Sequence, residues 1–220
     1  MNKKSMLIIT IIIASAAIAA ISYSAMPDPM ATHWGINGEP NGYSDKFFGT
    51  FLMPGIIFLI TALLIFIPKI DPLKENIKKF YSYYENFVIV IIGFMLLTQI
   101  FMLLWNTGIK INPSIAIPLG IGVLFYYAGI MMQKAKRNWT IGIRTPWTLS
   151  SEKVWDKTHR LGGRMFRAAG IISLIGAFIP AYSFFFIIVP VLLSSACLIV
   201  YSYLEYRKEM RKSKNRKKRK

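Results

Sequence analysis

Uncharged apolar stretches of helical length alternate with short charged segments along this chain. Asp, Glu, Lys and Arg are absent from residues 5–27, 47–68, 86–109, 111–133 and 168–204. A helix needs about 20 residues to cross the apolar core of a bilayer, so each of the first four stretches is long enough for one crossing. The fifth stretch is too long for one crossing and fits two.

A turn signal divides this fifth stretch near its middle. Residues 180–183 read Pro-Ala-Tyr-Ser, and proline disfavours helix at the residue before it. The pattern therefore predicts an all-α, polytopic membrane protein with six transmembrane helices. The fifth of these helices is short unless it begins before Ala168.

The overall composition agrees with the membrane class. The chain has 220 residues, of which 54% are hydrophobic and 17% are charged. A soluble domain of this size carries about 25% charged residues. The single cysteine, Cys197, excludes an internal disulfide.

Lysine and arginine are distributed unevenly between the two predicted sides. With the N-terminus inside, the inner segments hold 25 of the 27 basic residues, and the outer segments hold only Lys46 and Lys110. Basic residues accumulate on the cytoplasmic side of membrane proteins. The sequence therefore predicts a multi-pass membrane protein with both termini in the cytoplasm.

The first apolar stretch is compatible with a cleaved signal peptide or with an uncleaved helix. Lys3 and Lys4 precede it, as they would in either case. Tyr23 is bulky where a cleavage site needs a small residue, so the uncleaved helix is favoured.

The outer segment, residues 26–46, carries turn signals and one histidine. Asn37-Gly38 and Asn41-Gly42 are turn dipeptides, which predict an ordered, hydrogen-bonded loop. His33 lies among carboxylates at irregular spacing, whereas a zinc site shows clustered His or Cys. A structural loop is favoured over a metal site.

An amphipathic pattern follows the second apolar stretch. Asp71-Pro72 resembles a helix cap and first helical residue, and apolar side chains then recur at spacings of four, three and four from Leu73 to Tyr84. We expect this helix to lie in the membrane interface before the third crossing. Gln99, within that crossing, is a candidate functional residue, although Gln more often joins helices to each other.

The longest polar segment, residues 138–164, holds three of the five tryptophans, Trp139, Trp147 and Trp155, together with Arg144. Tryptophan favours the membrane–water boundary, where its ring is half buried and its N–H stays hydrated. We therefore predict a structured cap on the inner membrane face.

Residues 142–147 should form a bent, non-helical connection in this cap. Thr145 precedes Pro146 and is therefore driven to an extended conformation. The five donors of Arg144 suit backbone carbonyls of its own chain, a lipid phosphate or an acidic partner.

A second interfacial helix is predicted to follow. Ser150 or Ser151 can cap it, and Glu152 lies favourably near its positive end. We place His159 on the surface of this helix and expect residues 162–163, Gly-Gly, to turn the chain into the fifth crossing.

The C-terminal segment, residues 207–220, carries ten basic residues. Such runs are usually disordered and are attracted to anionic lipid by about 1 kcal/mol per residue near the surface. Together with the inner loops, the tail predicts contact with anionic lipids, and no direct contact with nucleic acid is expected.

Two motifs resemble known membrane proteins. The run IGIRTPWTLSSEKVW resembles the signature of the SdpI-type family, membrane immunity proteins against the Sdp killing peptide of bacilli. The outer phrase MPDPMATHWGINGEPNGY is similar to an amino-terminal module often found in the same proteins. The matching residues of the first motif are Gly142, Arg144, Thr145, Pro146, Trp147, Thr148, Glu152, Val154 and Trp155. Those of the second are Pro27, Asp28, Pro29, Thr32, His33, Trp34, Gly38 and Gly42.

The resemblance implies a non-enzymatic, receptor-like protein of a prokaryotic plasma membrane, without a cofactor. Family members protect the cell from a secreted peptide, and the founding member also holds its repressor at the cytoplasmic face. The candidate partner-binding residues are Gly142, Arg144, Thr145, Pro146, Trp147, Glu152 and Trp155. Asp28, His33 and Trp34 are the candidate toxin-facing residues of the outer loop.

The resemblance and the helix pattern together divide the chain into four parts. These are a two-span module (1–68) with its outer loop (26–46), an interfacial helix and third span (69–110), an SdpI-like module (111–206) with its inner loop (134–167), and the basic tail (207–220). Toxin immunity is the leading functional hypothesis. A small-solute transporter or channel would depend on Gln99, and a membrane enzyme using His33 ranks lowest.

Overall fold

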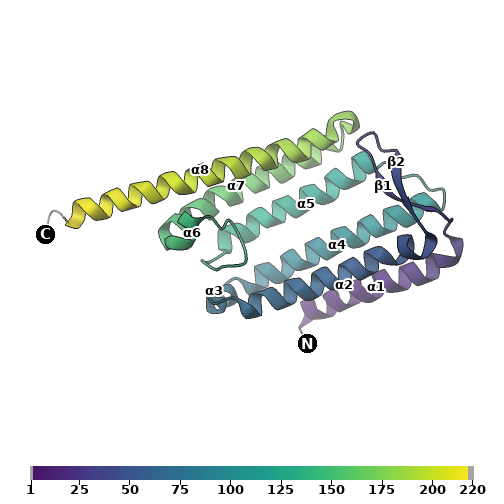
Figure 1. The fold of residues 1–220 in the computed structure, drawn as a ribbon, viewed down its shortest axis with the longest axis horizontal. Helices are drawn as coiled ribbons and strands as arrows, with labels where there is room; N and C mark the ends of the chain where they lie inside the picture. Colours follow the sequence, from purple (N-terminus) through teal and green to yellow (C-terminus); the bar gives the residue numbers. More distant parts are fainter. Residues whose placement is uncertain (1, 218–220) are drawn as a thin grey trace.

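A computed structural model describes residues 2–217 as a helical bundle with one small β-hairpin (Figure 1). The long helices are α1 (Lys3–Ser22), α2 (Lys46–Ile70), α4 (Tyr81–Asn106), α5 (Pro113–Lys134), α7 (Glu152–Gly176) and α8 (Ser183–Lys217). The short elements are η1 (Tyr23–Ala25), β1 (Met30–Trp34), β2 (Pro40–Ser44), α3 (Lys74–Lys78), α6 (Pro146–Ser150) and η2 (Pro180–Tyr182).

Within the described residues, five helices are long and apolar enough to cross a membrane. They are Lys3–Ala25, Lys46–Ile70, Tyr81–Asn106, Pro113–Lys134 and Pro180–Lys212. Many of the large apolar side chains on these helices face outward, as lipid-facing side chains do. The predicted turn at residues 180–183 is confirmed, because η2 separates α7 from α8.

The helices form two groups of three. Helices α1, α2 and α4 pack together, α7 packs against both α5 and α8, and the main helix contact between the groups is α4 against α5. Figure 1 shows the β-hairpin at one end of the bundle, with α3 and α6 at the opposite end. We call the first the hairpin end and the second the cap end.

Both ends of the described chain lie at the cap end (Figure 1). The Nζ of Lys4 donates to the carbonyl and the hydroxyl of Ser82, at the start of α4. The carboxyl-terminal part of α8 contacts the loop between α5 and α7 through Ser202. In Figure 1, α8 extends beyond the other helices.

Helix α7 differs from the prediction. It is one continuous helix from Glu152 to Gly176, and it is not among the five sufficiently apolar helices, because its first half is strongly polar. The chain does not turn at Gly162 and Gly163. Instead, both glycines are buried, and a Cβ on Gly163 would lie 2.6 Å from the carbonyl oxygen of Gly129 on α5. These glycines allow close helix packing, and they do not make a bend.

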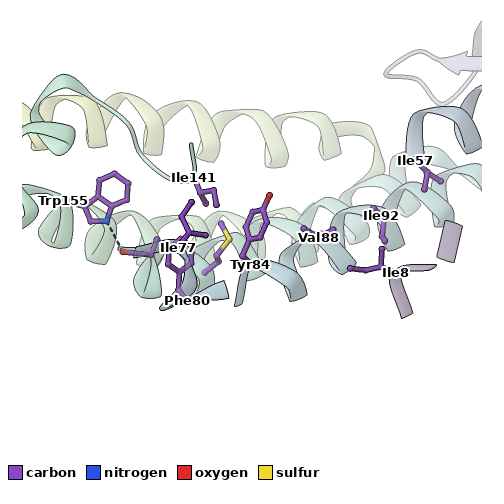
Figure 2. Packing of buried hydrophobic residues seen from close by; sticks show 11 residues of the cluster. Ile8, Ile57, Ile77, Phe80, Tyr84, Val88, Ile92, Ile141 and Trp155 are labelled. Atoms are coloured by element: carbon purple, nitrogen blue, oxygen red, sulfur yellow. Dashed lines mark hydrogen bonds between the residues drawn. The ribbon is translucent and has the colours of Figure 1, made fainter. Parts of the chain in front are cut away.

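The predicted interfacial helix after α2 is also different. Only Lys74–Lys78 forms a helix there, and α4 begins at Tyr81. The apolar face of this segment does not face lipid, because Ile77, Phe80 and Tyr84 are buried in the core of the protein. Figure 2 shows these side chains in a cluster that runs from Ile8 and Ile57 to Trp155 of α7.

The outer segment is an ordered, hydrogen-bonded hairpin, in agreement with the prediction, and its β1 and β2 form an antiparallel pair within the otherwise helical fold. One further expectation is wrong. The basic tail is not disordered through Lys217, because α8 continues to that residue. Residues 218–220 of the predicted tail lie outside the described residues.

Gln99 joins helices to each other. Its amide donates to the carbonyl of Ser15 on α1 at 2.9 Å and accepts from the Ser15 hydroxyl. Both side chains are completely buried. The residue on which the transporter hypothesis depends therefore has its donor and its acceptor engaged within the bundle.

Candidate functional site

The loop between α5 and α7 is built around one buried amide. Asn138 is fully buried and donates to the carbonyls of Lys136 and Ile141 at 2.8 and 3.0 Å. Its Oδ1 accepts from the backbone N–H groups of Thr140 and Ile141 at 2.9 and 2.6 Å. Local side-chain bonds of this kind fix a turn, because they replace the backbone partners that a helix would supply.

Asp71 attaches this loop to the other half of the bundle. Its Oδ2 accepts from the Trp139 N–H at 2.9 Å and from the Thr140 hydroxyl at 2.7 Å. Its Oδ1 accepts from the Leu73 N–H at 2.7 Å. Asp71 is 2% exposed, so a carboxylate just after α2 holds the loop that precedes α7. The predicted helix start at this residue is wrong, since α3 begins at Lys74.

Trp155 and His159 are buried beneath the loop between α5 and α7. Trp155 is fully buried and donates from Nε1 to the carbonyl of Ala135 at 2.9 Å (Figure 2). The ring of His159 stacks on Trp155 with 3.9 Å between the ring centroids. Trp155 is therefore a core residue, and the prediction of a half-buried boundary tryptophan is wrong at this position.

His159 is also buried, and the prediction of a surface position is wrong. Its Nε2 accepts from the Ile143 N–H at 3.0 Å, and its Nδ1 lies 3.0 Å from the carbonyl of Trp155. These partners select a neutral ring that donates from Nδ1 and accepts at Nε2. Gly142 has a φ of 110°, and a Cβ there would lie 2.4 Å from Nε2, so only glycine fits this close approach.

The connection to α7 is fixed by reciprocal caps. Thr145 is extended, as predicted, and forms a capping box with Thr148. Its hydroxyl also donates to Ser202 of α8 at 3.0 Å. Pro146 and Trp147 are not in an irregular connection, because they begin the short helix α6. The Trp147 ring packs on Tyr203 of α8 at 5.1 Å.

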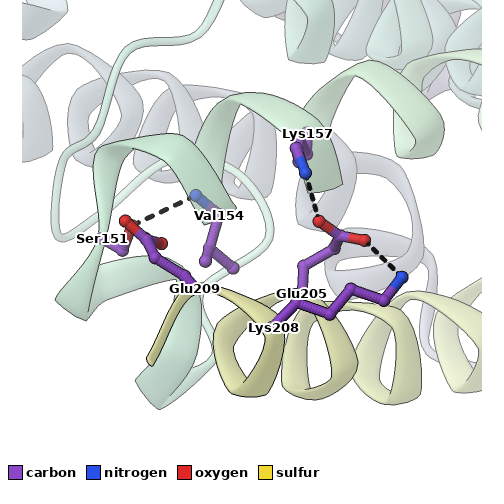
Figure 3. Close-up of polar contacts among 6 residues, drawn as sticks. All are labelled: Ser151, Val154, Lys157, Glu205, Lys208 and Glu209. Carbon is purple, nitrogen blue, oxygen red and sulfur yellow. Dashed lines mark hydrogen bonds and ion pairs between the residues drawn. The ribbon is translucent and has the colours of Figure 1, made fainter. Parts of the chain in front are cut away.

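Helix α7 is attached to α8 by polar contacts at the cap end (Figure 3). Ser151 caps α7 by accepting from the Val154 N–H at 3.3 Å, and it donates to Glu209 at 2.6 Å. Glu205 of α8 pairs with Lys157 of α7 and, at 2.9 Å, with Lys208. The cap end of α8 is thereby held against the loop and α7.

Two neighbouring side chains are exposed on the cap. Trp139 is 53% exposed, and Arg144 is exposed next to it. Arg144 donates from Nη1 to the Trp139 carbonyl at 3.0 Å, so one of its predicted roles, a contact within its own chain, is present. Glu152 is exposed and lies 3.8 Å from Arg137, in the first turn of α7.

The toxin-facing candidates do not form one cluster. Asp28 accepts from the Lys46 N–H at 3.3 Å, and the Nδ1 of His33 lies 2.6 Å from the Oδ1 of Asn41. Trp34 packs edge-on against Trp105 of α4. His33 and Trp34, but not Asp28, line a groove at the hairpin end.

Comparison with known proteins identifies the family. The SdpI/YfhL protein family matches residues 134–203, and a domain of unknown function, DUF1648, matches residues 10–58. The chain is 30% identical over 207 residues to the immunity protein SdpI of Bacillus subtilis (strain 168). This similarity covers 94% of the chain and 97% of that relative. The chain belongs to the SdpI/YfhL family. No solved structure matches it.

Within this SdpI/YfhL protein, sequence reasoning missed the residues that hold the cap together. The sequence pattern predicts a helix cap at Asp71 and a surface position for His159, and it predicts no role for Asn138. The available signals were an Asp-Pro dipeptide at a helix end and a polar amide four residues before a glycine. The first signal does not indicate Trp139 and Thr140, which follow Asp71 by 68 and 69 residues. The second signal does not indicate burial, although the partners of Asn138 lie within three residues of it.

The buried histidine predicts a pH dependence of stability in this family member. Burial lowers the pKa of His159 from 6.5 to about 4. The unfolded chain therefore binds a proton between pH 6.5 and 4 that the folded cap excludes, and stability falls as the pH falls through this range. The expected loss is about 1.4 kcal/mol per pH unit.

Thermal unfolding in detergent at several pH values checks this dependence. The unfolding temperature is plotted against pH for the wild type and for His159→Gln. The difference between the two slopes gives the contribution of His159, because both proteins share the same carboxylates and the same exposed His33. Parallel slopes between pH 6.5 and 5 would contradict a buried neutral ring.

Proposed function

We propose that this protein is a plasma-membrane immunity protein that protects a bacterium from a secreted killing peptide. The observation that carries the proposal is the similarity to the immunity protein SdpI over nearly the full length of both chains. The five apolar helices support a membrane location. A family of immunity proteins also supports a non-enzymatic role.

In the proposed topology, α7 enters the membrane after its polar first half as the fifth of six crossings, and the cap end faces the cytoplasm. Six crossings bring both termini to one side, in agreement with the contacts of Lys4 and Ser202 at the cap end. The positive-inside pattern supports the orientation. The basic residues near the end of α8 would then meet anionic lipid of the inner leaflet.

Survival of a sensitive strain tests the immunity function. A bacterium killed by the Sdp killing peptide would express the full chain, and its survival would be compared with that of cells carrying an empty vector. We expect a dose–response curve shifted to higher peptide concentrations. Unchanged killing, with the protein detected in the membrane fraction, would contradict immunity.

Capture of a cytosolic transcriptional repressor is a second candidate function, favoured by one feature of the cap. Trp139 and Arg144 are exposed beside each other at the end that would face the cytoplasm, and aromatic and arginine side chains are frequent anchors of protein interfaces. Co-purification of a small DNA-binding protein should then be lost with Arg144→Ala. It should be retained with Arg160→Ala, which removes another exposed cation from the same end. Retention with both variants would contradict the role of this surface.

A further inference from the structure

We propose that the groove at the hairpin end binds an apolar segment of the secreted peptide. This inference rests on the proposed immunity function. The groove has a volume of about 980 Å³ and lies among the β-hairpin, α2, α4, the start of α5 and the start of α8. Figure 1 shows these elements meeting at the end opposite the cap. The volume lies at the upper end of the range for ligand sites.

The wall of the groove is apolar and rich in adaptable side chains. Methionine and aromatic residues fit irregular apolar surfaces, because methionine is flexible and polarisable. The apolar wall is formed chiefly by Met53, Phe101, Met102, Trp105, Ile117 and Phe184. A ligand that binds in the groove must therefore present apolar side chains to this wall.

The polar lining favours a peptide over a phospholipid. It includes His33, Asn37, Asn41 and Ser114, and neither lysine nor arginine is among the described residues that line the groove. A phospholipid headgroup would seek cations. Asparagine offers both a donor and an acceptor, which suits the N–H and C=O groups of a peptide backbone. Near the groove, the exposed carboxylate of Glu39 and the ammonium of Lys110, which lies 5.7 Å from the centre of the Trp105 ring, are opposite in sign and leave no net charge to select an anionic headgroup.

The depth of the groove limits what can enter. Its lining on α4 extends from Thr98 to Trp105, which at 1.5 Å per residue is about 10 Å along the helix. This length accepts about two turns of a helical peptide or a short bend. It is too short for a complete membrane-spanning helix, so the site takes one end or one bend of the toxin.

Trp34 adds an unused donor at this site. Its indole N–H is buried and has no acceptor among the described residues, while its ring lies against Trp105. A buried donor without a partner is unfavourable by about 1–3 kcal/mol. A peptide carbonyl that reaches this N–H on binding would relieve that cost.

Two pairs of matched substitutions test the site. Ile117 lines the groove, whereas Leu119 on the same helix is exposed and does not. Phe184 lines the groove, whereas its exposed neighbour Phe185 does not. Ile117→Trp would fill the groove and Phe184→Ala would remove part of its wall. Leu119→Trp and Phe185→Ala make the same chemical changes outside it.

The probe is a fluorescent Sdp killing peptide added to the full chain in phospholipid nanodiscs. We expect Ile117→Trp and Phe184→Ala each to weaken binding by about tenfold or more, which corresponds to a loss of about 1.4 kcal/mol. Leu119→Trp and Phe185→Ala should stay within about twofold of the wild type. Phe184 is itself exposed, so its variant remains informative if Ile117→Trp does not fold.

Binding and survival together separate the two proposals. Wild-type protein that protects cells, with equal binding by all four variants, would overturn the groove and leave immunity standing. Wild-type protein that protects cells without measurable binding of the peptide would also overturn the groove and leave immunity standing. Wild-type protein that neither protects nor binds would overturn both. A photoreactive group at position 117 that crosslinks lipid alone, whatever the peptide concentration, would show a lipid pocket and also overturn the peptide site.

Discussion

Asp71→Ala is expected to release the cap loop from the amino-terminal half of the bundle and to lower stability by roughly 3–5 kcal/mol. The reason is that one buried carboxylate accepts from Leu73, Trp139 and Thr140. Alanine leaves these three partly buried donors without their acceptor. Hydrogen bonds to a charged group contribute about 1.5–3 kcal/mol each, and they are not additive within one cluster.

Thermal unfolding of the detergent-solubilised variant measures this loss. Glu75→Ala is the matched control, because Glu75 lies four residues away and its side chain is 70% exposed. Its removal should change stability by less than about 0.5 kcal/mol. The stability of Asp71→Asn should lie between those of Asp71→Ala and Glu75→Ala, since the amide keeps one acceptor oxygen. An Asp71→Ala protein as stable as the Glu75→Ala protein would show that the loop is held by other contacts.

Alanine at Gly129 is expected to force α5 and α7 apart, with a loss of about 2–3 kcal/mol. An added Cβ would lie 2.6 Å from the carbonyl oxygen of Gly163 and 2.8 Å from the backbone nitrogen of Arg167. Backbone atoms cannot move aside as the end of a side chain can. Gly122 and Gly170 repeat the same reciprocal approach two helical turns away, so the whole α5–α7 interface depends on small residues.

Gly55→Ala on α2 provides the control, because a Cβ there meets nothing within 4 Å. Alanine has a higher helix propensity than glycine, so Gly55→Ala should leave the stability unchanged or raise it slightly. The measurement is the unfolding temperature, together with the fraction of monodisperse protein after purification. Equal behaviour of Gly129→Ala and Gly55→Ala would contradict the close packing of α5 and α7.

The features predicted from sequence are those fixed by local chemistry. The apolar stretches form helices, the turn at residues 180–183 is present, Thr145 is extended, and Ser151 caps α7. Each depends on chain length, on proline or on a side chain that bonds within a few residues.

The errors come from partners that are distant in sequence. An apolar helix face has the same period whether it contacts lipid or protein. The pattern therefore predicts Ile77 and Phe80 at the membrane interface, whereas they pack in one cluster with Ile141 and Trp155. A Gly-Gly pair predicts a bend and a close helix contact equally well, and only the carbonyl of Gly129 decides for contact. The groove was not predicted, because its lining comes from four separate helices and the hairpin.

The orientation of the bundle decides whether the groove can meet a secreted peptide and the cap a cytosolic protein. Single cysteines at Ile36, in the hairpin turn, and at Trp139, in the cap, would be introduced with Cys197→Ser; both positions are more than half exposed. A membrane-impermeant maleimide should label the cysteine at position 36 in intact cells and the cysteine at position 139 only after the membrane is opened. Labelling of position 139 in intact cells would place the cap outside and contradict the account.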